Sequence, residues 1–183
     1  MNKKLIITLL AGLLPTLASA HNLEIGQVLP SVDVADKGEI LLTQDKIAYQ
    51  AWATEQLVGK VRVIQAIAGR SAAKEMNAPM IDAIKAADLP TDKYQTTTII
   101  NQDDAIWGTG GFVKSSAEDS KREFAWSSMV LDANGNVQQA WDLQQENSMI
   151  ALLDAKGTVL FAQEGQLSEQ DIQRVLKLIN NNL

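Results

Sequence analysis

A run of β-branched and apolar residues, Val61–Ile67, passes after Ala68 and Gly69 directly into a helical pattern. The run has the composition of a buried central strand. From Ser71 to Ala87 the apolar residues Met76, Met80, Ile81 and Ile84 recur at helical spacing and form one stripe. A central strand followed at once by an amphipathic helix restricts the chain to folds in which helices pack on a sheet.

A proline inside the helical pattern predicts a bend. Pro79 has no backbone N–H and its ring clashes with the preceding turn, which costs about 3 kcal/mol in a straight helix. The segment 45–57 fits neither period. The other patterns predict strands at 32–34, 40–42 and 94–100, a turn at 36–38, a helix within 106–123, Asp-x-x-Gly hairpins at 129–137 and 151–159, and a last helix from Ser168. This order indicates one α/β domain with a central mixed sheet, flanking helices and extra N-terminal strands.

The first twenty residues have the pattern of a secretory signal peptide. Lys3 and Lys4 give a positive start, Leu5 to Leu14 are mainly apolar, and Ala18-Ser19-Ala20 is a small-x-small cleavage site. The apolar part is shorter than the roughly 20 residues that span a membrane, and no cysteine follows for a lipid anchor. We expect cleavage after Ala20, a mature domain 21–183 that does not span the membrane, and a periplasmic location; the alternative is an uncleaved anchor.

Composition excludes several function classes. Without Lys3 and Lys4 the 16 basic residues become 14 against 22 acidic ones, a formal charge of −8, and the basic residues form no stripe. We therefore expect no nucleic-acid partner and no binding to anionic lipid. With no cysteine and one histidine, the chain has no disulfide, thiolate nucleophile, Fe–S cluster, sulfur-bound zinc or multi-histidine site. We expect neither a metal nor a cofactor.

Residues 71–84 align without a gap with the thioredoxin signature C-G-P-C-K-M-I-A-P-I-L-D-E-I. The identical positions are Met76, Ala78, Pro79, Asp82 and Ile84. The preceding Gly-Lys-Val-Arg-Val and the closing hairpin and helix are also similar to exported thioredoxin-like proteins, so the resemblance covers about residues 25–181. It implies a thioredoxin-like fold. More narrowly, residues 68–77 and the paired Asp-x-x-Gly motifs resemble the YtfJ family, exported thioredoxin-fold proteins with no established activity.

The sequence departs from thioredoxins at both halves of the redox site. Ser71 replaces the attacking cysteine and Lys74 the resolving one, while Ser148 stands at or near the place of the cis-proline. Serine and lysine form no reducible bond, and a hydroxyl supplies no thiolate. Disulfide exchange and thiol peroxidase chemistry are therefore excluded for this chain acting alone.

The resemblance implies a ligand site at the start of the bent helix. In thioredoxin folds the N–H groups there face the ligand and favour anions, and Arg70 and Lys74 add positive charge. We expect Arg70, Ser71 and Lys74, with Asn147 and Ser148 of the facing loop, to bind a peptide, a protein or a small anionic ligand. None of them is predicted to be catalytic, and a structural partner in an envelope assembly is an equivalent interpretation.

An enzyme is the alternative to a binding module. Ser71 and Lys74 form S-x-x-K, the spacing with which serine penicillin-binding proteins and β-lactamases activate a nucleophile. Their further S-D-N and K-T-G motifs are missing. The simpler interpretation is that Ser71 caps the helix through its hydroxyl and that Lys74 is solvated.

Three other features suggest sites. Core packing explains at least two of the four tryptophans, and Trp107, in a glycine-containing loop, is the one expected to line a ligand groove. His21, as a mature N-terminus, could chelate copper, but a second histidine is missing and a disordered terminus is the simpler interpretation. Asp132-x-Asn134-x-Asn136 lacks the glycine and glutamate of a calcium loop.

Overall fold

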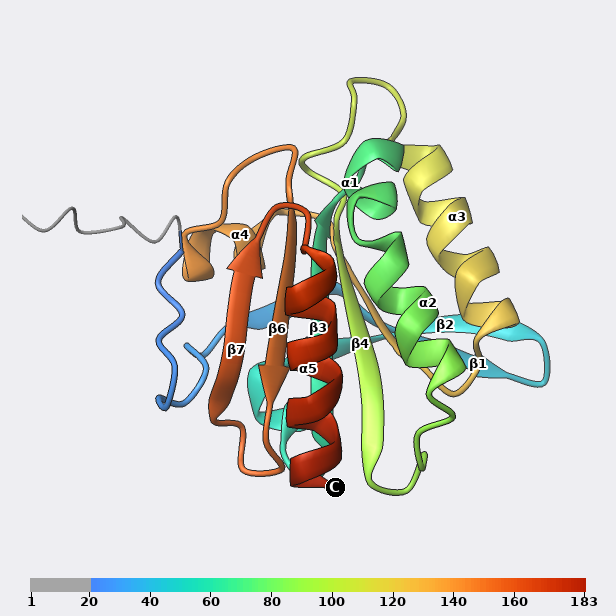
Figure 1. Ribbon diagram of the computed structural model, residues 1–183. Coiled ribbons are helices and arrows are strands. Elements are labelled where there is room, and N and C mark those ends of the chain that lie inside the picture. The colour runs from blue at the N-terminus through green and yellow to red at the C-terminus, as the bar shows by residue number, and fades with distance from the viewer. Residues whose placement is uncertain (1–20) are drawn as a thin grey trace, which may run out of the picture.

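The computed structural model describes residues 21–183, and the expected signal peptide lies outside the described residues. One seven-stranded sheet has the order β2-β1-β5-β4-β3-β6-β7 (Figure 1). Its strands are β1 (Asp33–Thr43), β2 (Lys46–Ala53), β3 (Val61–Ala68), β4 (Tyr94–Asn101), β5 (Ser128–Asp132), β6 (Ser148–Leu153) and β7 (Val159–Glu164). The helices are η1 (Thr54–Leu57), α1 (Ser71–Met76), α2 (Ala78–Ala86), α3 (Gly110–Glu123), α4 (Asn136–Trp141) and α5 (Glu169–Asn182).

The predicted central strand is the centre of the sheet. All eight residues of β3 are buried. β3 runs parallel to β4, from the pair Val61 and Tyr94 to the pair Ala68 and Asn101, and antiparallel to β6. β4 and β5 are also parallel. The expectation of a mixed α/β sheet is therefore confirmed.

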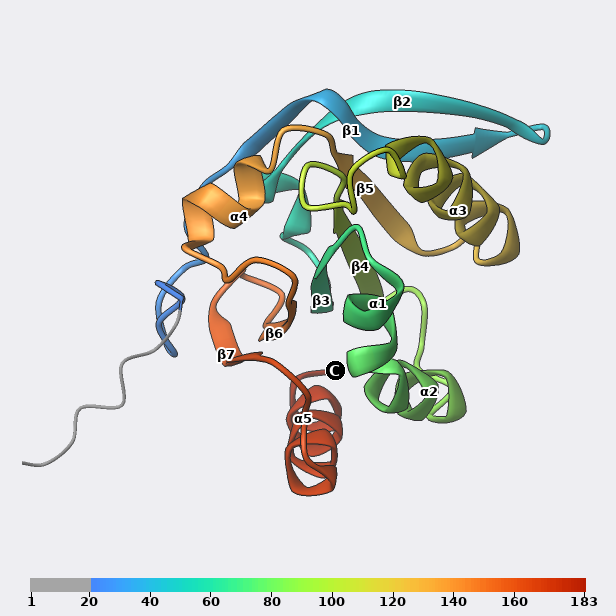
Figure 2. The same ribbon diagram turned by 90° about the horizontal axis from the view of Figure 1, so that it is seen from above.

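Helices cover both faces of this sheet. Seen from above, α1, α2, α3 and α5 lie around one side, and α4 lies on the other (Figure 2). The α2 and α5 side chains pack on β3, β4, β6 and β7, whereas α4, η1 and the N-terminal segment close the opposite face around Trp52 and Trp141. No helix in residues 21–183 is long and apolar enough to cross a membrane.

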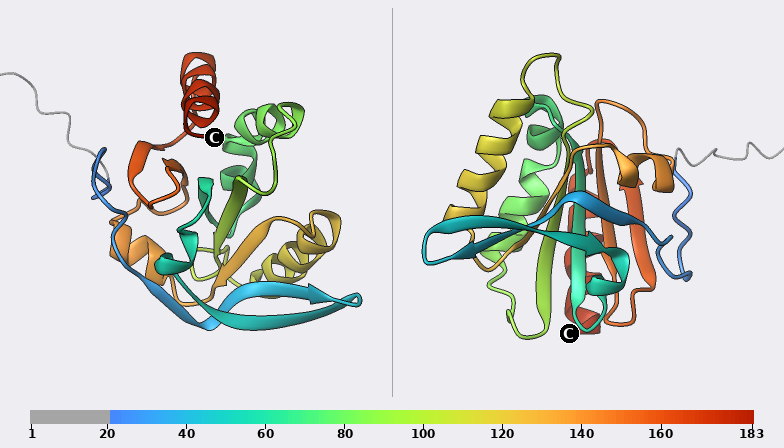
Figure 3. Two further views of the ribbon diagram at one scale, coloured as in Figure 1. Left: turned by 90° about the horizontal axis from the view of Figure 1, so that it is seen from below. Right: turned by 180° about the vertical axis from the view of Figure 1, so that it is seen from behind.

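The prediction of a turn at 36–38 is wrong, because β1 continues through it. The β1–β2 ribbon runs across the direction of the central strands (Figure 3) and pairs with β5 only at Gly38 and Glu39. Gly38 has φ +76°, and a Cβ there would lie 2.1 Å from the carbonyl oxygen of Gln50. A glycine in this conformation forms a bulge that bends the strand without ending it. The unassigned segment 45–57 forms β2 and η1.

The bend at Pro79 is confirmed as a full interruption. The helix stops at Met76 and restarts at Ala78, so Pro79 occupies the first turn of α2. The backbone N–H at this position of a helix has no intrahelical acceptor, so a proline there loses no hydrogen bond. The break between the two helices falls on Asn77, which has φ −115° and ψ 21°.

Of the two predicted hairpins, only 151–159 is confirmed. Both Asp-x-x-Gly segments have a left-handed glycine, Gly135 and Gly157. After Gly157 the chain forms β7, which pairs with β6. After Gly135 it forms α4 instead, because Gln138, Gln139 and Ala140 are helix formers. Asp132 accepts from the backbone N of Asn136 and of Val137, at 3.0 and 2.8 Å, and so caps this helix.

Candidate ligand-binding site

One buried side chain, that of Asn77, fixes the position of the break between α1 and α2. Asn77 is 1% exposed, and its Nδ2 donates to Ser148 Oγ at 2.9 Å and to the Gly165 carbonyl at 3.0 Å. Its Oδ1 accepts from the backbone N of Leu167 at 3.0 Å. Asn77 therefore joins the α1–α2 break to the start of β6 and to the loop before α5. The sequence signal was a polar residue two positions before the helix-bending proline.

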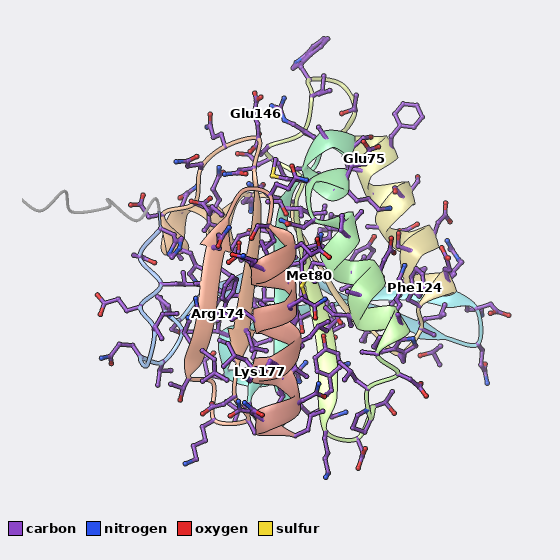
Figure 4. The ribbon with its side chains drawn as sticks, in the orientation of Figure 1. Glu75, Met80, Phe124, Glu146, Arg174 and Lys177 are labelled. Carbon is purple, nitrogen blue, oxygen red and sulfur yellow. The ribbon has the colours of Figure 1, made fainter. Side chains whose placement is uncertain are left out.

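Arg70 joins three loops at the end of the sheet where α1 begins. Its Nε donates to the Asp104 carbonyl at 3.0 Å, and Nη2 lies 3.2 Å from Asp104 Oδ1. Nη1 lies 3.1 Å from Glu146 Oε1, and the backbone N of Glu146 donates to Asp104 Oδ2 at 2.6 Å. An anionic ligand at this guanidinium competes with two carboxylates that are already bound. Figure 4 shows Glu146 at this end of the molecule.

The side chains of Ser71 and Lys74 do not form the expected hydrogen-bonded pair. Both side chains are exposed, and within residues 21–183 no hydrogen bond joins them. The prediction that Ser71 caps the helix is wrong: the residue at the N-cap position is Arg70, and α1 has no side-chain cap. Lys74 makes no ion pair with any described residue.

No hydrogen bond in residues 21–183 joins the facing-loop residues Asn147 and Ser148 to Ser71 or Lys74. The Ser148 hydroxyl is buried against Asn77, and the backbone N of Ser148 donates to Asn147 Oδ1 at 2.9 Å. Asn147 lines a hollow of about 20 Å³ beside α4, which is too small for an organic ligand. Trp107 is 97% exposed and lines neither this hollow nor the large cavity over β3 and β4.

Glu164 borders the same small hollow, and one of its two carboxylate oxygens is buried without a hydrogen bond to any described residue. Its Oε1 accepts from the backbone N of Gln144 at 2.8 Å. Its Oε2 is buried and has no hydrogen-bond partner among the residues that the structure describes. Burial raises the pKa of the Glu164 carboxyl, and the hydrogen bond from Gln144 opposes that shift.

A much larger cavity, of about 600 Å³, lies over β3 and β4 between the α1–α2 unit and α3. Arg70, Ser71 and Lys74 line it near the start of α1, and Lys85, Phe124 and Trp126 line it near the ends of α2 and α3. Figure 4 shows Phe124 at the end of α3 next to α2. The apolar walls comprise Ile67, Ile81, Ile84, Ile100, Phe112, Val113, Ala117 and Met129.

The floor of this cavity is more polar than its walls. Gln65, Thr96 and Thr98 lie on the face of β3 and β4 that carries the cavity. The Thr96 hydroxyl is hydrogen-bonded to the Tyr94 hydroxyl at 3.0 Å. Gln65 was not among the predicted site residues; its signal was a polar side chain inside the β-branched run of the central strand.

The comparisons with known proteins agree with the resemblance found in the sequence. The model of the family described as "Bacterial protein of unknown function (YtfJ_HI0045)" matches residues 23–182. The chain belongs to this family. It is 48% identical over 183 residues to the Escherichia coli (strain K12) "Uncharacterized protein YtfJ", and each chain is covered completely. It is 49% identical over 179 residues to an "Uncharacterized protein" of Haemophilus influenzae, with 97% of each chain covered.

Solved structures show the fold. A thiol-disulfide isomerase from Corynebacterium glutamicum superposes with a TM-score of 0.56 at 17% identity, covering 86% of this chain and 96% of that one. The fold is therefore thioredoxin-like, as expected. At this identity the likeness extends to the fold alone. The chemistry in the name of that structure depends on thiols, and this family member has no cysteine.

The described part of the chain contains no cluster of side chains that could bind a metal ion. No group of three or more His, Cys, Asp or Glu side chains in residues 21–183 could hold an ion. At His21 the Nδ1 atom accepts from the backbone N of Leu23 at 3.2 Å. Burial lowers the pKa of His21.

Proposed function

We propose that this protein is a non-catalytic binding module of the periplasm, and that it holds a small amphipathic molecule in the cavity between α2 and α3. The observation that carries the proposal is the cavity itself. Its volume of about 600 Å³ is in the range of sites that hold small organic ligands, and its walls are apolar with a few polar groups. Of the ligand classes expected from the sequence, a small molecule with an anionic end fits it best.

The surroundings of Ser71 favour binding over catalysis. A serine nucleophile needs a base within hydrogen-bond reach, and the base needs a third group that orients it. In the described residues Ser71 has no such bond and Lys74 has no orienting partner. Both side chains line the mouth of the cavity, where they can meet the polar end of a ligand.

The periplasmic location is supported by the pattern of residues 1–20. Expression of the full chain with a C-terminal tag, followed by osmotic shock, tests it. We expect the protein in the released fraction and N-terminal sequencing that begins at His21. A protein retained in the cytoplasm, with residues 1–20 still attached, would contradict this part of the proposal.

Two carboxylates of equal chain length serve as probes for the binding role: tridecanoate, and its analogue N-hexanoyl-aminohexanoate, which has an amide in the middle of the chain. We expect at least one of them to raise the melting temperature of the wild-type protein. A ligand at 100 times its dissociation constant adds about 2.7 kcal/mol to stability. Isothermal titration calorimetry then gives the dissociation constant.

A matched pair of variants places the ligand. Ser116 lines the cavity and Ser115, its neighbour on α3, does not, and both are exposed. Ser116→Trp puts a large ring at the cavity and is expected to abolish binding, whereas Ser115→Trp keeps it. Absence of binding to the wild type, or equal binding by both variants, would refute a ligand site in this cavity.

A further inference from the structure

One buried polar side chain at the floor of the cavity has no partner. Gln65 lies in the middle of β3, and on the same face of the strand Val63 and Ile67 are apolar and buried. Gln65 is 5% exposed, lines the cavity, and makes no side-chain hydrogen bond to any residue between 21 and 183. Its side-chain amide is not fully enclosed, so its polar atoms remain accessible from the cavity. A ligand that displaces water there has to replace the hydrogen bonds of that water, and a group that both donates and accepts can do so.

The next strand supplies a second polar group at the same level. Thr98 is the register partner of Gln65 across β3 and β4, and it also lines the cavity. Its hydroxyl has no hydrogen bond within the described part of the chain. We infer that Gln65 and Thr98 form a polar subsite that binds an uncharged amide group of the ligand, an inference that rests on the proposed function. Both side chains donate and accept, as an amide does.

The distribution of charge argues that the group at this subsite is neutral. The charged residues that line the cavity are Arg70, Lys74, Lys85 and Glu123. None of them is buried, so a carboxylate beside Gln65 would lie at the floor of the cavity among uncharged side chains and without a cation, which is costly. The subsite therefore selects an amide over an acid.

The anionic end of the ligand belongs at Lys74. Arg70 is already bonded to Asp104, and Lys85 lies 3.8 Å from Asp82, whereas Lys74 has no ion pair in residues 21–183. Ala68, where β3 ends, is about 10 Å along the strand from Gln65. The ligand class is then an acyl amide whose carboxylate is several bonds from the amide, with the acyl chain directed toward Phe124.

The test compares the two carboxylate probes on the wild type and on Gln65→Leu. N-hexanoyl-aminohexanoate carries the amide and tridecanoate does not. We expect Gln65→Leu to weaken binding of the amide probe about tenfold, the effect of one hydrogen bond, and to leave tridecanoate unchanged or tighter. Thermal unfolding without ligand checks that Gln65→Leu is folded.

The outcomes separate this inference from the proposed function. If Gln65→Leu changes the affinity for both probes equally while Ser116→Trp abolishes the binding of both, the cavity binds ligand but the subsite does not recognise an amide. If the wild type binds neither probe, both proposals fail. Thr98→Val, which keeps the side-chain shape, provides a second test should Gln65→Leu fold poorly, and we expect the same selective loss for the amide probe.

Discussion

The side-chain amide of Asn77, at the break between α1 and α2, donates to the hydroxyl of Ser148, the first residue of β6, at 2.9 Å. The resemblance to thioredoxins puts the helix of the lost cysteines and the lost cis-proline at this place. In this chain two polar side chains close the gap between the helix and β6, and both are 1% exposed. The corner that serves redox chemistry in thioredoxins is a packed structural junction here.

Asn77→Ala should therefore be strongly destabilising. It leaves Ser148, the Gly165 carbonyl and the Leu167 amide without a partner, and each buried unsatisfied group costs about 1–3 kcal/mol. We expect a loss of about 3 kcal/mol in the free energy of unfolding, measured by urea denaturation. Asn134→Ala is the control, because Asn134 is exposed. A loss below about 1 kcal/mol for Asn77→Ala would show that the junction does not depend on this side chain.

The sequence predicted the parts of the fold that depend on local patterns. The β-branched composition of residues 61–67 and the capping residues at Ser168 were sufficient for β3 and α5. The wrong predictions depended on tertiary contacts. Gly38 indicates a turn from its type alone, and only the pairing of β1 with β2 on both sides of it makes it a bulge.

The candidate site was predicted less completely for the same reason. Arg70, Ser71 and Lys74 were found from their place in the thioredoxin signature, and all three line the large cavity. Their chemical environment depends on residues distant in sequence: Asp104 and Glu146 come to Arg70 from other loops. The cavity itself depends on where α3 packs, which no local pattern in residues 106–123 specifies.

The Arg70 contacts predict a second stability effect. Arg70→Met removes the cation that the nearly buried Asp104 carboxylate contacts, and separates the loops that Arg70 joins. Its side chain is 25% exposed, so solvent weakens the interaction, and we expect a loss of about 1–2 kcal/mol in urea denaturation. Arg122→Met, which breaks an exposed pair with Asp119, should change stability by less than about 0.5 kcal/mol. Equal effects would mean that Arg70 is an ordinary surface residue.

Glu164 predicts a dependence of stability on pH. Burial raises its pKa in the folded protein, so the folded state favours the protonated form. The contribution of this group to stability is therefore complete below the pKa of the unfolded chain and is lost as pH rises through the folded pKa. Glu164→Gln keeps an acceptor for Gln144 without the charge. We expect it to be more stable than the wild type at pH 7, by less than about 1 kcal/mol, and equal to it near pH 4 in thermal unfolding.

The same measurement on Glu24→Gln, a change at an exposed carboxylate, gives the baseline for losing one negative charge from an acidic protein. A stabilisation of Glu164→Gln that is the same at both pH values, or no larger than that of Glu24→Gln, would show that burial of the Glu164 charge does not influence folding.

Replacing the serines at the starts of α5 and α1 with alanine should have different effects on stability. Ser168 caps α5 in a capping box with Asp171, so Ser168→Ala should cost about 1 kcal/mol. Ser71 lies inside α1 and makes no cap, so Ser71→Ala should be neutral or slightly stabilising, since alanine is the better helix former. Chemical denaturation of the two variants in parallel decides the matter. A cost for Ser71→Ala as large as that of Ser168→Ala would restore the capping role expected from the sequence.

The tryptophans give a direct signal of ligand binding. Trp126 is 47% exposed and lines the cavity, Trp107 is 97% exposed and does not, and Trp52 and Trp141 are buried in the core. A ligand whose acyl chain reaches Phe124 excludes water from the Trp126 ring, so its fluorescence emission should shift to shorter wavelength on titration with the amide probe. Trp126→Phe should remove this shift without abolishing the heat of binding in calorimetry, and Trp107→Phe should preserve both. If the shift instead disappears in Trp107→Phe and persists in Trp126→Phe, the ligand lies at the exposed loop of Trp107 and not between α2 and α3.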